Sequence, residues 1–442
     1  MLIHGRPSEL DALFAFAAAL ALSWLLVPLT ELLARRVGAM DHPRSRSLHR
    51  VPTPKLGGLA ILAGTVVAMA LFLPWVASTR ALIGGAVLIA AVGVADDLFE
   101  LGPLPKLVGQ IAAAMLPVFA GVVVTSFTLP FVGRVSLDHV LFGNVALLGN
   151  VKVGHILTVL GFVAVMNVIN FIDGVDGLAA GVCVIASATF AIIALSLNRT
   201  GAGVLAALTA GGSLGFLRRG FPPAASFMGD TGSNLLGYLL AAVAVLGSLK
   251  TNAVVALFFP LCVLAVPILD SGFVIAKRIK YKRPIYVGDR SHFHHRMANI
   301  GFSQRRTLAY LYGWALILAG LALALRFVPY SDNHGHFDPL WTAVMVACGV
   351  AAVAASIYLL LALEILKLRL SRFRELVGLG VPVSAPKEVD SGVARELETG
   401  SFPPVDPETG EFAAVEPSDD ERARNQPRRP SGTGAAGFER DA

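Results

Sequence analysis

The sequence predicts an all-α polytopic membrane protein, because of its composition and its long apolar runs. Of its 442 residues, 55% are hydrophobic and only 15% are charged, and the mean hydropathy is +0.68. A soluble domain carries about 25% charged residues. An apolar run of roughly 20 residues can cross a bilayer as a helix. We expect eleven transmembrane helices, at about residues 10–34, 56–76, 80–95, 107–125, 154–171, 178–197, 202–217, 233–248, 254–276, 308–327 and 340–366.

The distribution of lysine and arginine predicts the orientation of these spans. The loops after spans 1, 3, 5, 7 and 9 share one side of the membrane and carry eighteen basic residues, against seven on the other side. Loops rich in Lys and Arg stay in the cytoplasm. We therefore expect the N-terminus outside and the C-terminus in the cytoplasm.

We expect residues 1–376 to form the membrane domain. Two segments of the chain differ in composition from its membrane-spanning helices. Residues 126–153 alternate apolar and polar residues among glycines, which predicts a small external hairpin. Residues 377–442 are rich in proline and charge and poor in large apolar residues, which predicts a disordered cytoplasmic tail. The three cysteines fall inside apolar runs, and we interpret them as packing residues.

Acidic residues and histidines gather at the ends of apolar runs, all on the predicted cytoplasmic side. Ionisable groups at a membrane boundary are costly and usually serve ion, substrate or proton chemistry. Their convergence on one face predicts a single polar site. The residues concerned are Asp96, Asp97, Asp173, Asp176, Asp230, His292, His294 and His295.

Spacing supports this interpretation for one segment. Asn167, Asn170 and Asp173 are three residues apart, so on a helix they would share a stripe. Gly174 and Gly177 then allow the backbone to approach a ligand closely. The structural alternative is a polar helix end with capping side chains.

The remaining acids fit a hard cation. Mg²⁺ takes one or two carboxylates and completes its coordination with water and substrate phosphates. Asp96, Asp97 and Asp230 could supply such carboxylates, or one of the first two could activate a nucleophile. Aspartate is also favoured at helix N-caps and turns, which is the structural alternative for all three.

Basic and imidazole groups could bind the anionic part of a substrate. Lys106 and Gln110 are four apart and could hold an anionic headgroup, although a snorkelling lysine is an equal alternative. Three imidazoles within four residues could bind zinc, but the acids favour a hard cation. We therefore expect His292, His294 and His295 to donate to phosphate.

Five motifs together resemble the polyprenyl-phosphate N-acetylhexosamine-1-phosphate transferases, in the family's order and over about residues 10–325. The motifs are PTPKLGG (52–58), DDLFE (96–100), NFIDGVDGLA (170–179), FMGDTGS (227–233) and HFHHRM (292–297).

The resemblance implies a magnesium-dependent reaction, with Mn²⁺ as a substitute, in which a lipid phosphate attacks the β-phosphorus of a UDP-sugar and UMP leaves. It implies that Asp230, with Asp97, binds metal, and that Asp96 or Asp97 deprotonates the lipid phosphate. The substrate-binding residues that it implies are Lys55, Lys106, Asn167, Asn170, Asp173, Asp176, Phe227, His292, His294 and His295.

The His-Phe-His-His-Arg pattern resembles the family branch that uses simple UDP-N-acetylhexosamines, most often UDP-GlcNAc, rather than the phospho-MurNAc-pentapeptide transferases. The product would be undecaprenyl-diphosphate-sugar, which initiates a cell-surface polysaccharide at the bacterial inner membrane. Other classes are a proton-coupled transporter, a lipid flippase or an assembly scaffold. We expect a lipid phosphate, a UDP-sugar and the membrane as partners, with a homodimer left open and no nucleic acid.

Overall fold

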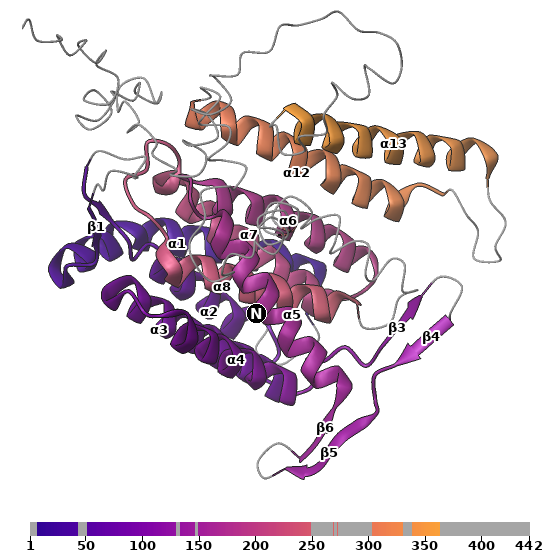
Figure 1. Ribbon diagram of the computed structural model, residues 1–442, viewed down its shortest axis with the longest axis horizontal. Coiled ribbons are helices and arrows are strands. Elements are labelled where there is room, and N and C mark those ends of the chain that lie inside the picture. The colour runs from indigo at the N-terminus through magenta and orange to yellow at the C-terminus, as the bar shows by residue number, and fades with distance from the viewer. Residues whose placement is uncertain are drawn as a thin grey trace, which may run out of the picture.

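The predicted apolar runs form helices in the computed structural model, which describes residues 7–42, 51–129, 133–145, 149–248, 303–329 and 338–362, with positions 268 and 272. Figure 1 shows the helices of this described part gathered in one bundle, with the last two lying along its upper side. The helices are α1 (Glu9–Val37), α2 (Gly58–Phe72), α3 (Ala77–Phe99), α4 (Pro103–Phe119), α5 (Val153–Ile172), α6 (Leu178–Ser196), α7 (Thr200–Gly220), α8 (Gly229–Ser248), α12 (Gln304–Phe327) and α13 (Pro339–Ala362).

These helices confirm a helical, multi-pass membrane protein. Among the described residues, eight helices are long and apolar enough to cross a membrane, whereas α2 and α4 are shorter apolar helices. The expected span at 254–276, apart from positions 268 and 272, lies outside the described residues, as do the three histidines and the tail 377–442.

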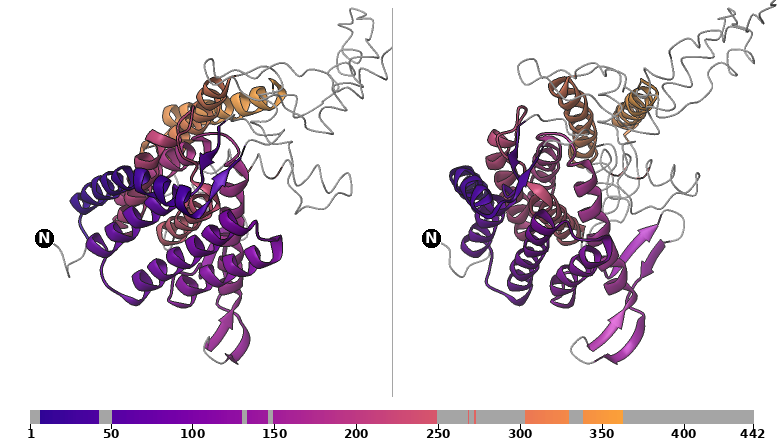
Figure 2. Two further views of the ribbon diagram at one scale, coloured as in Figure 1. Left: turned by 90° about the vertical axis from the view of Figure 1, so that its left-hand side faces the viewer. Right: turned by 60° about the vertical axis from the view of Figure 1, so that its left-hand side comes forward.

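Three antiparallel strand pairs accompany the helices. The expected hairpin at 126–153 is in fact two hairpins. Both lie at the N-terminal end of α5, and the views in Figure 2 place them away from the first strand pair. The pairs are β1 (Met40–Asp41) with β2 (Thr53–Pro54), β3 (Ser126–Leu129) with β4 (Gly133–Ser136), and β5 (Val140–Val145) with β6 (Gly149–Lys152).

Small residues allow the central helices to pack closely. Most of the length of α6, α7 and α8 is buried inside the bundle. Gly211 and Gly215 of α7 face backbone carbonyls of α1, and a Cβ at either position would collide with them. Glycines four apart allow two membrane helices to approach in this way.

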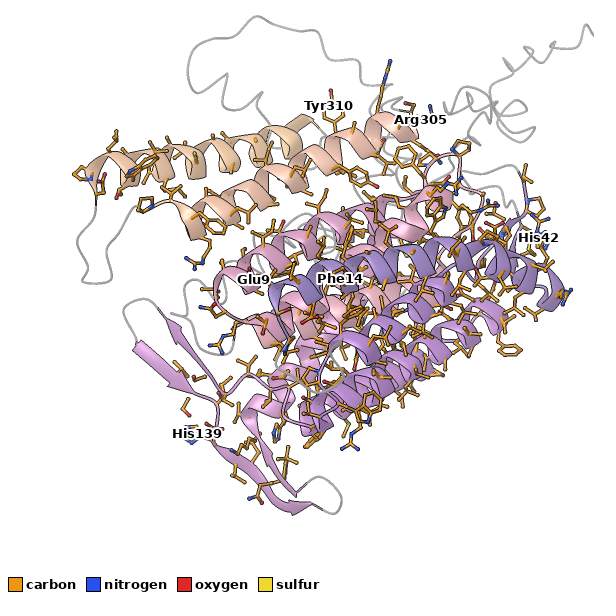
Figure 3. All side chains as sticks on the ribbon, turned by 180° about the vertical axis from the view of Figure 1, so that it is seen from behind. Glu9, Phe14, His42, His139, Arg305 and Tyr310 are labelled. Atoms are coloured by element: carbon orange, nitrogen blue, oxygen red, sulfur yellow. The ribbon has the colours of Figure 1, made fainter. Side chains whose placement is uncertain are left out.

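The outer surface has the polarity expected of a membrane protein. In Figure 3, Glu9 and His139 lie towards one end of the bundle and His42 and Arg305 towards the other. The exposed Phe14 lies between the two ends. Polar groups therefore mark the bundle ends, and apolar side chains cover the surface between them.

Candidate active site

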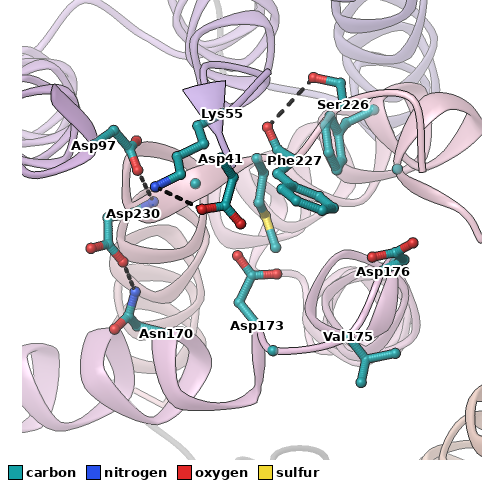
Figure 4. Close-up of a pocket in the computed structure, with 16 residues that line it drawn as sticks. Asp41, Lys55, Asp97, Asn170, Asp173, Val175, Asp176, Ser226, Phe227 and Asp230 are labelled. Carbon is teal, nitrogen blue, oxygen red and sulfur yellow. Dashed lines mark hydrogen bonds and ion pairs between the residues drawn. The ribbon is translucent and has the colours of Figure 1, made fainter. Parts of the chain in front are cut away.

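A cavity of about 360 Å³ opens at the end of the bundle that holds the C-termini of α3, α5 and α7 and the start of α8 (Figure 4). Segments far apart in the sequence meet there, and most of the side chains that line it are polar. The lining residues are Asp41, Lys55, Asp97, Asn170, Asp173, Gly174, Val175, Asp176, Gly177, Phe216, Gly220, Ser226, Phe227, Met228, Gly229 and Asp230.

Backbone pairing brings the first motif to the cavity. The Phe227 N–H donates to the Pro54 carbonyl at 2.8 Å, and the Gly57 N–H donates to the Phe227 carbonyl at 3.0 Å. Lys55 lies between these bonds, and its Nζ is 3.3 Å from Oδ1 of Asp41. The PTPKLGG motif therefore holds the segment that carries Phe227 and also contributes a cation to the lining.

Asp97 caps the start of α8 from another helix. Its Oδ1 accepts from the Asp230 N–H at 2.9 Å, and its Oδ2 accepts from the N–H and hydroxyl of Thr231 at 3.1 and 2.7 Å. A carboxylate is stabilised there by the free N–H groups and the positive end of the helix. Gly229 has φ +65°, and a Cβ on it would lie 2.5 Å from Oδ2 of Asp97. Only glycine fits this approach.

Asp96 faces a different partner, although α3 continues through both acids and ends at Phe99. Lys106 Nζ is 2.9 Å from Asp96 Oδ2 and 2.8 Å from Asp230 Oδ2. Asn170 donates to Asp230 Oδ1 and to the Ser233 hydroxyl. We call Asp96, Lys106, Asn170 and Asp230 the lysine side of the cavity; Asp96 is buried behind it and does not line it.

The α5–α6 connection forms the opposite wall, residues 173–177, which we call the loop side. Asp173 is the C-cap of α5, and Figure 4 shows its carboxylate turned towards Asp41 and Lys55. Asp176 accepts from the Ala224 N–H at 3.0 Å. Burial raises the pKa of Asp173 well above its usual range, and the nearby carboxylates, first of all Asp230, raise it further.

Asn167 does not line the cavity. It lies one turn before Asn170 on α5 and donates to Gln110 Oε1 and to the Val163 carbonyl, both at 2.8 Å. Gln110 in turn donates to Asn234 Oδ1 at 2.8 Å. Both predicted partners of the anionic headgroup, Lys106 and Gln110, therefore bind protein groups on α8 in this structure.

The lining is acidic, and its donors fit a hard divalent cation. Among the described residues, five carboxylates line the cavity, whereas Lys55 is the one basic side chain. No three acidic, histidine or cysteine side chains of this part of the chain converge closely enough to hold an ion by themselves. Mg²⁺ needs only one or two carboxylates when water and substrate phosphates complete its shell. Asp230 and Asp97 suit that role.

Most of the predicted site residues thus meet at one cavity. Lys55, Asp97, Asn170, Asp173, Asp176, Phe227 and Asp230 line it, Asp96 and Lys106 lie directly behind it, and Asn167 lies one turn deeper. The sequence analysis missed four contributors. Asp41 lies beyond the first span, and Thr231 lies inside a recognised motif. Asn234 and Tyr312 lie in apolar helices, and the Tyr312 hydroxyl donates to the carbonyl of Gly177 in the lining. Only Asn234, four residues after Asp230, carried a usable spacing signal.

Comparison with known proteins gives matches over this same region. Residues 79–248 match the glycosyl transferase family 4. The chain is 36% identical to the "Probable undecaprenyl-phosphate N-acetylglucosaminyl 1-phosphate transferase" of Bacillus subtilis, over 71% of this chain and 84% of that protein. It is 35% identical to the decaprenyl-phosphate N-acetylglucosaminephosphotransferase of Mycobacterium leprae, over 74% and 86%. A phospho-N-acetylmuramoyl-pentapeptide-transferase of Desulforudis audaxviator is 32% identical, over 72% and 98%.

Proposed function

We propose that this chain, which belongs to glycosyl transferase family 4, transfers N-acetylglucosamine 1-phosphate from UDP-GlcNAc to a polyprenyl phosphate such as undecaprenyl phosphate. One observation carries the proposal. The four motifs that lie within the described residues, PTPKLGG, DDLFE, NFIDGVDGLA and FMGDTGS, meet at a single acidic cavity at one end of a membrane bundle. Such a reaction must bring a water-soluble sugar donor and a lipid acceptor together, and the end of a membrane bundle is where both can reach one cavity.

The reaction is a displacement at phosphorus. A phosphate oxygen of the lipid forms a bond to the β-phosphorus of UDP-GlcNAc, and the bond from that phosphorus to the bridging oxygen breaks. UMP leaves with the electron pair, and the product is the lipid-diphosphate-sugar. Phosphoryl transfer asks little covalent chemistry of a protein, which acts through positioning and neutralisation of charge.

Asp230 and Asp97 would hold Mg²⁺, or Mn²⁺ in its place, and the bound ion would neutralise charge on the diphosphate. Lys106 orients Asp230 through its ion pair, and Lys55, which lines the cavity, is placed to attract phosphate oxygens. Lys106 would contact the lipid phosphate from behind Asp230. Asp173, Asp176 and Phe227 line the wall where the nucleotide would bind, and Asn170 would reach the nucleotide from the lysine side across the cavity. His292, His294 and His295 are proposed to donate to the diphosphate or the sugar.

The alternative role for Asp97 is to accept a proton from the lipid phosphate, and it is better placed for this than Asp96. It lines the cavity, whereas Asp96 is buried against Lys106. The role of Asp96 would then be to hold Lys106 in position between two carboxylates. A general base adds little at neutral pH, because a phosphate monoester with a second pKa near 6 is mostly ionised by then.

The proposed topology has eleven spans in residues 1–376, with the cavity on the cytoplasmic face of the bacterial inner membrane. All described cavity residues lie at one end of the bundle, as a single cytoplasmic site requires. Residues 377–442 would then be a cytoplasmic tail that the reaction does not need. External labelling of single cysteines should reach position 134 in intact cells but not position 173, and the reverse pattern would overturn this orientation.

The deciding experiment uses the purified full-length protein with undecaprenyl phosphate, Mg²⁺ and labelled UDP-GlcNAc. We expect labelled lipid and an equal amount of UMP, and loss of both when a chelator is added. Release of UDP would mean transfer of the sugar alone. Turnover of UDP-MurNAc-pentapeptide in place of UDP-GlcNAc would move the chain to the other family branch, and substrate uptake into vesicles without UMP would favour a transporter.

A further inference from the structure

Three carboxamides, two of them buried and one half-buried, connect the helices beneath the lysine side. Asn167 of α5 donates to Gln110 Oε1, Gln110 of α4 donates to Asn234 Oδ1, and Asn234 of α8 donates to the Asp230 carbonyl, each at 2.8 Å. Gln110 and Asn234 are each 1% exposed. We call Asn167, Gln110 and Asn234 the amide chain.

The amide chain runs in one direction. Every member donates to the next, and the last donation ends on the backbone of Asp230. The second hydrogen of Asn167 goes to the Val163 carbonyl of its own helix. Turning the Gln110 amide over would set two donors against each other at Asn167 and two acceptors against each other at Asn234. Because an unmet buried amide is costly, the order of donors is fixed.

Each member of the amide chain lies one helical turn from a residue of the lysine side. Gln110 is four residues from Lys106, Asn167 is three from Asn170, and Asn234 is four from Asp230. Residues three or four apart lie on one face of a helix. The amide chain and the lysine side are therefore two successive layers across α4, α5 and α8.

We propose that Asn167, Gln110 and Asn234 are positioning residues, which hold Lys106, Asn170 and Asp230 in register for the reaction and do not touch the substrate themselves. The proposal rests on the proposed function. The lysine side needs such support because its contacts are short and come from four separate helices, α3, α4, α5 and α8. A shift of about 1 Å in a reacting group can cost about 100-fold in rate.

The test compares stability with turnover in two variants. Gln110→Met keeps the packing volume but leaves Asn167 and Asn234 without their partner, so both thermal stability and kcat should fall. The triple variant Gln110→Met/Asn167→Leu/Asn234→Leu removes every polar member at once. Replacing a whole buried polar network with apolar groups can be nearly neutral for stability. We expect its melting temperature to recover towards wild type while kcat stays at least about tenfold lower.

Two further measurements separate positioning from general packing. The KM for UDP-GlcNAc should change by less than about threefold in both variants, because Asp173, Asp176 and Phe227 lie outside the amide chain. The matched control is Ser356→Ala, which removes another interhelical hydrogen bond, Trp314 Nε1 to Ser356 Oγ at 2.8 Å, between α12 and α13. Its kcat should equal that of wild type.

The outcomes are distinguishable. If kcat recovers with stability in the triple variant, or if Gln110→Met keeps wild-type kcat, the amide chain has no positioning role. If Ser356→Ala lowers kcat as much as Gln110→Met does, the loss comes from general packing, and the proposal is likewise wrong. If wild-type protein makes no lipid-linked product or UMP, the proposed function itself fails, and this result is visible before any variant is compared.

Discussion

The two walls of the cavity manage negative charge in different ways. On the lysine side, Lys106 bridges Asp96 and Asp230 at 2.9 and 2.8 Å, so the cation is built into the protein. On the loop side, Asp173 is surrounded by other carboxylates, and burial and this repulsion raise its pKa well above the usual range. The carboxylates of the lysine side are neutralised by a buried ammonium group, whereas Asp173 on the loop side lies among like charges.

This difference suggests a division of labour. A wall whose charged groups are already paired by short hydrogen bonds keeps its geometry without substrate. This suits residues that must be in place when a phosphoryl group is transferred. A wall with repelling carboxylates is stabilised when a cation or a set of donors arrives, so it suits recognition. The lysine side would then determine kcat, and the loop side would determine binding and ligand-dependent stability.

The sharpest test of the lysine side is Asp230→Asn. An amide has nearly the same volume, but it carries no charge for a cation and faces the ammonium of Lys106 with a weaker acceptor. We expect UMP release to fall by about 1,000-fold, with thermal stability close to wild type. The control is Asp138→Asn, which removes an exposed acid paired with Lys152 in the hairpin region. Near-normal turnover by Asp230→Asn would place the cation elsewhere.

Lys106→Met tests whether the built-in cation matters. It leaves Asp96, which is 8% exposed, facing Asp230 with no intervening charge. We expect about a 100-fold loss of kcat and a loss of about 3 kcal/mol in unfolding free energy, as for other broken buried pairs.

The matched control for this change is Lys152→Met, which breaks a pair of similar length, 3.0 Å, between side chains that are 39% and 52% exposed. Exposed pairs contribute about 0–1 kcal/mol, so its stability and activity should hardly change. If Lys106→Met and Lys152→Met change kcat and stability equally, the buried ion pairs of Lys106 have no particular role in the reaction.

Much of this arrangement was predictable from the sequence. Hydropathy placed the ten described helices, most of them to within about four residues at each end, although α4 ends six residues before the expected span does. The positions of acids after apolar runs predicted that Asp97, Asp173, Asp176 and Asp230 share one site. These inferences work because bilayer thickness fixes helix length and because charge at a membrane boundary is costly.

The remainder depends on contacts between helices, which a single sequence does not reveal. Asp96 and Asp97 are adjacent and chemically identical, yet one binds Lys106 and the other caps α8. Successive residues on a helix point about 100° apart, and only the packing of α4 and α8 decides what each meets. Asn167 shares the spacing of the site motif but turns to Gln110, because α4 lies on that side.

On the loop side, Asp173→Asn should lower activity about tenfold, if it removes one of several contacts to the nucleotide, yet it should raise stability in chelator. A carboxyl with a raised folded-state pKa destabilises the fold as pH rises above its unfolded pKa of about 3.9. The gain in melting temperature should therefore be small near pH 4, grow as the pH rises above that value, and shrink when Mg²⁺ is added. A gain that is independent of pH would argue against carboxylate repulsion.

The smallest expected effect comes from Tyr312→Phe, which tests what holds the loop side in place. The Tyr312 hydroxyl donates to the Gly177 carbonyl at 2.5 Å, and Gly177 has φ +75°, so this bond fixes the turn that follows Asp173 and Asp176. One lost hydrogen bond corresponds to about 0.5–1.5 kcal/mol. If the loop side governs recognition, the KM for UDP-GlcNAc should rise about threefold and kcat should stay nearly unchanged. Tyr310→Phe, at an exposed position on the same helix, is the control and should match wild type. A fall in kcat with unchanged KM would instead make the loop side part of the transfer step and would remove the distinction between the two walls.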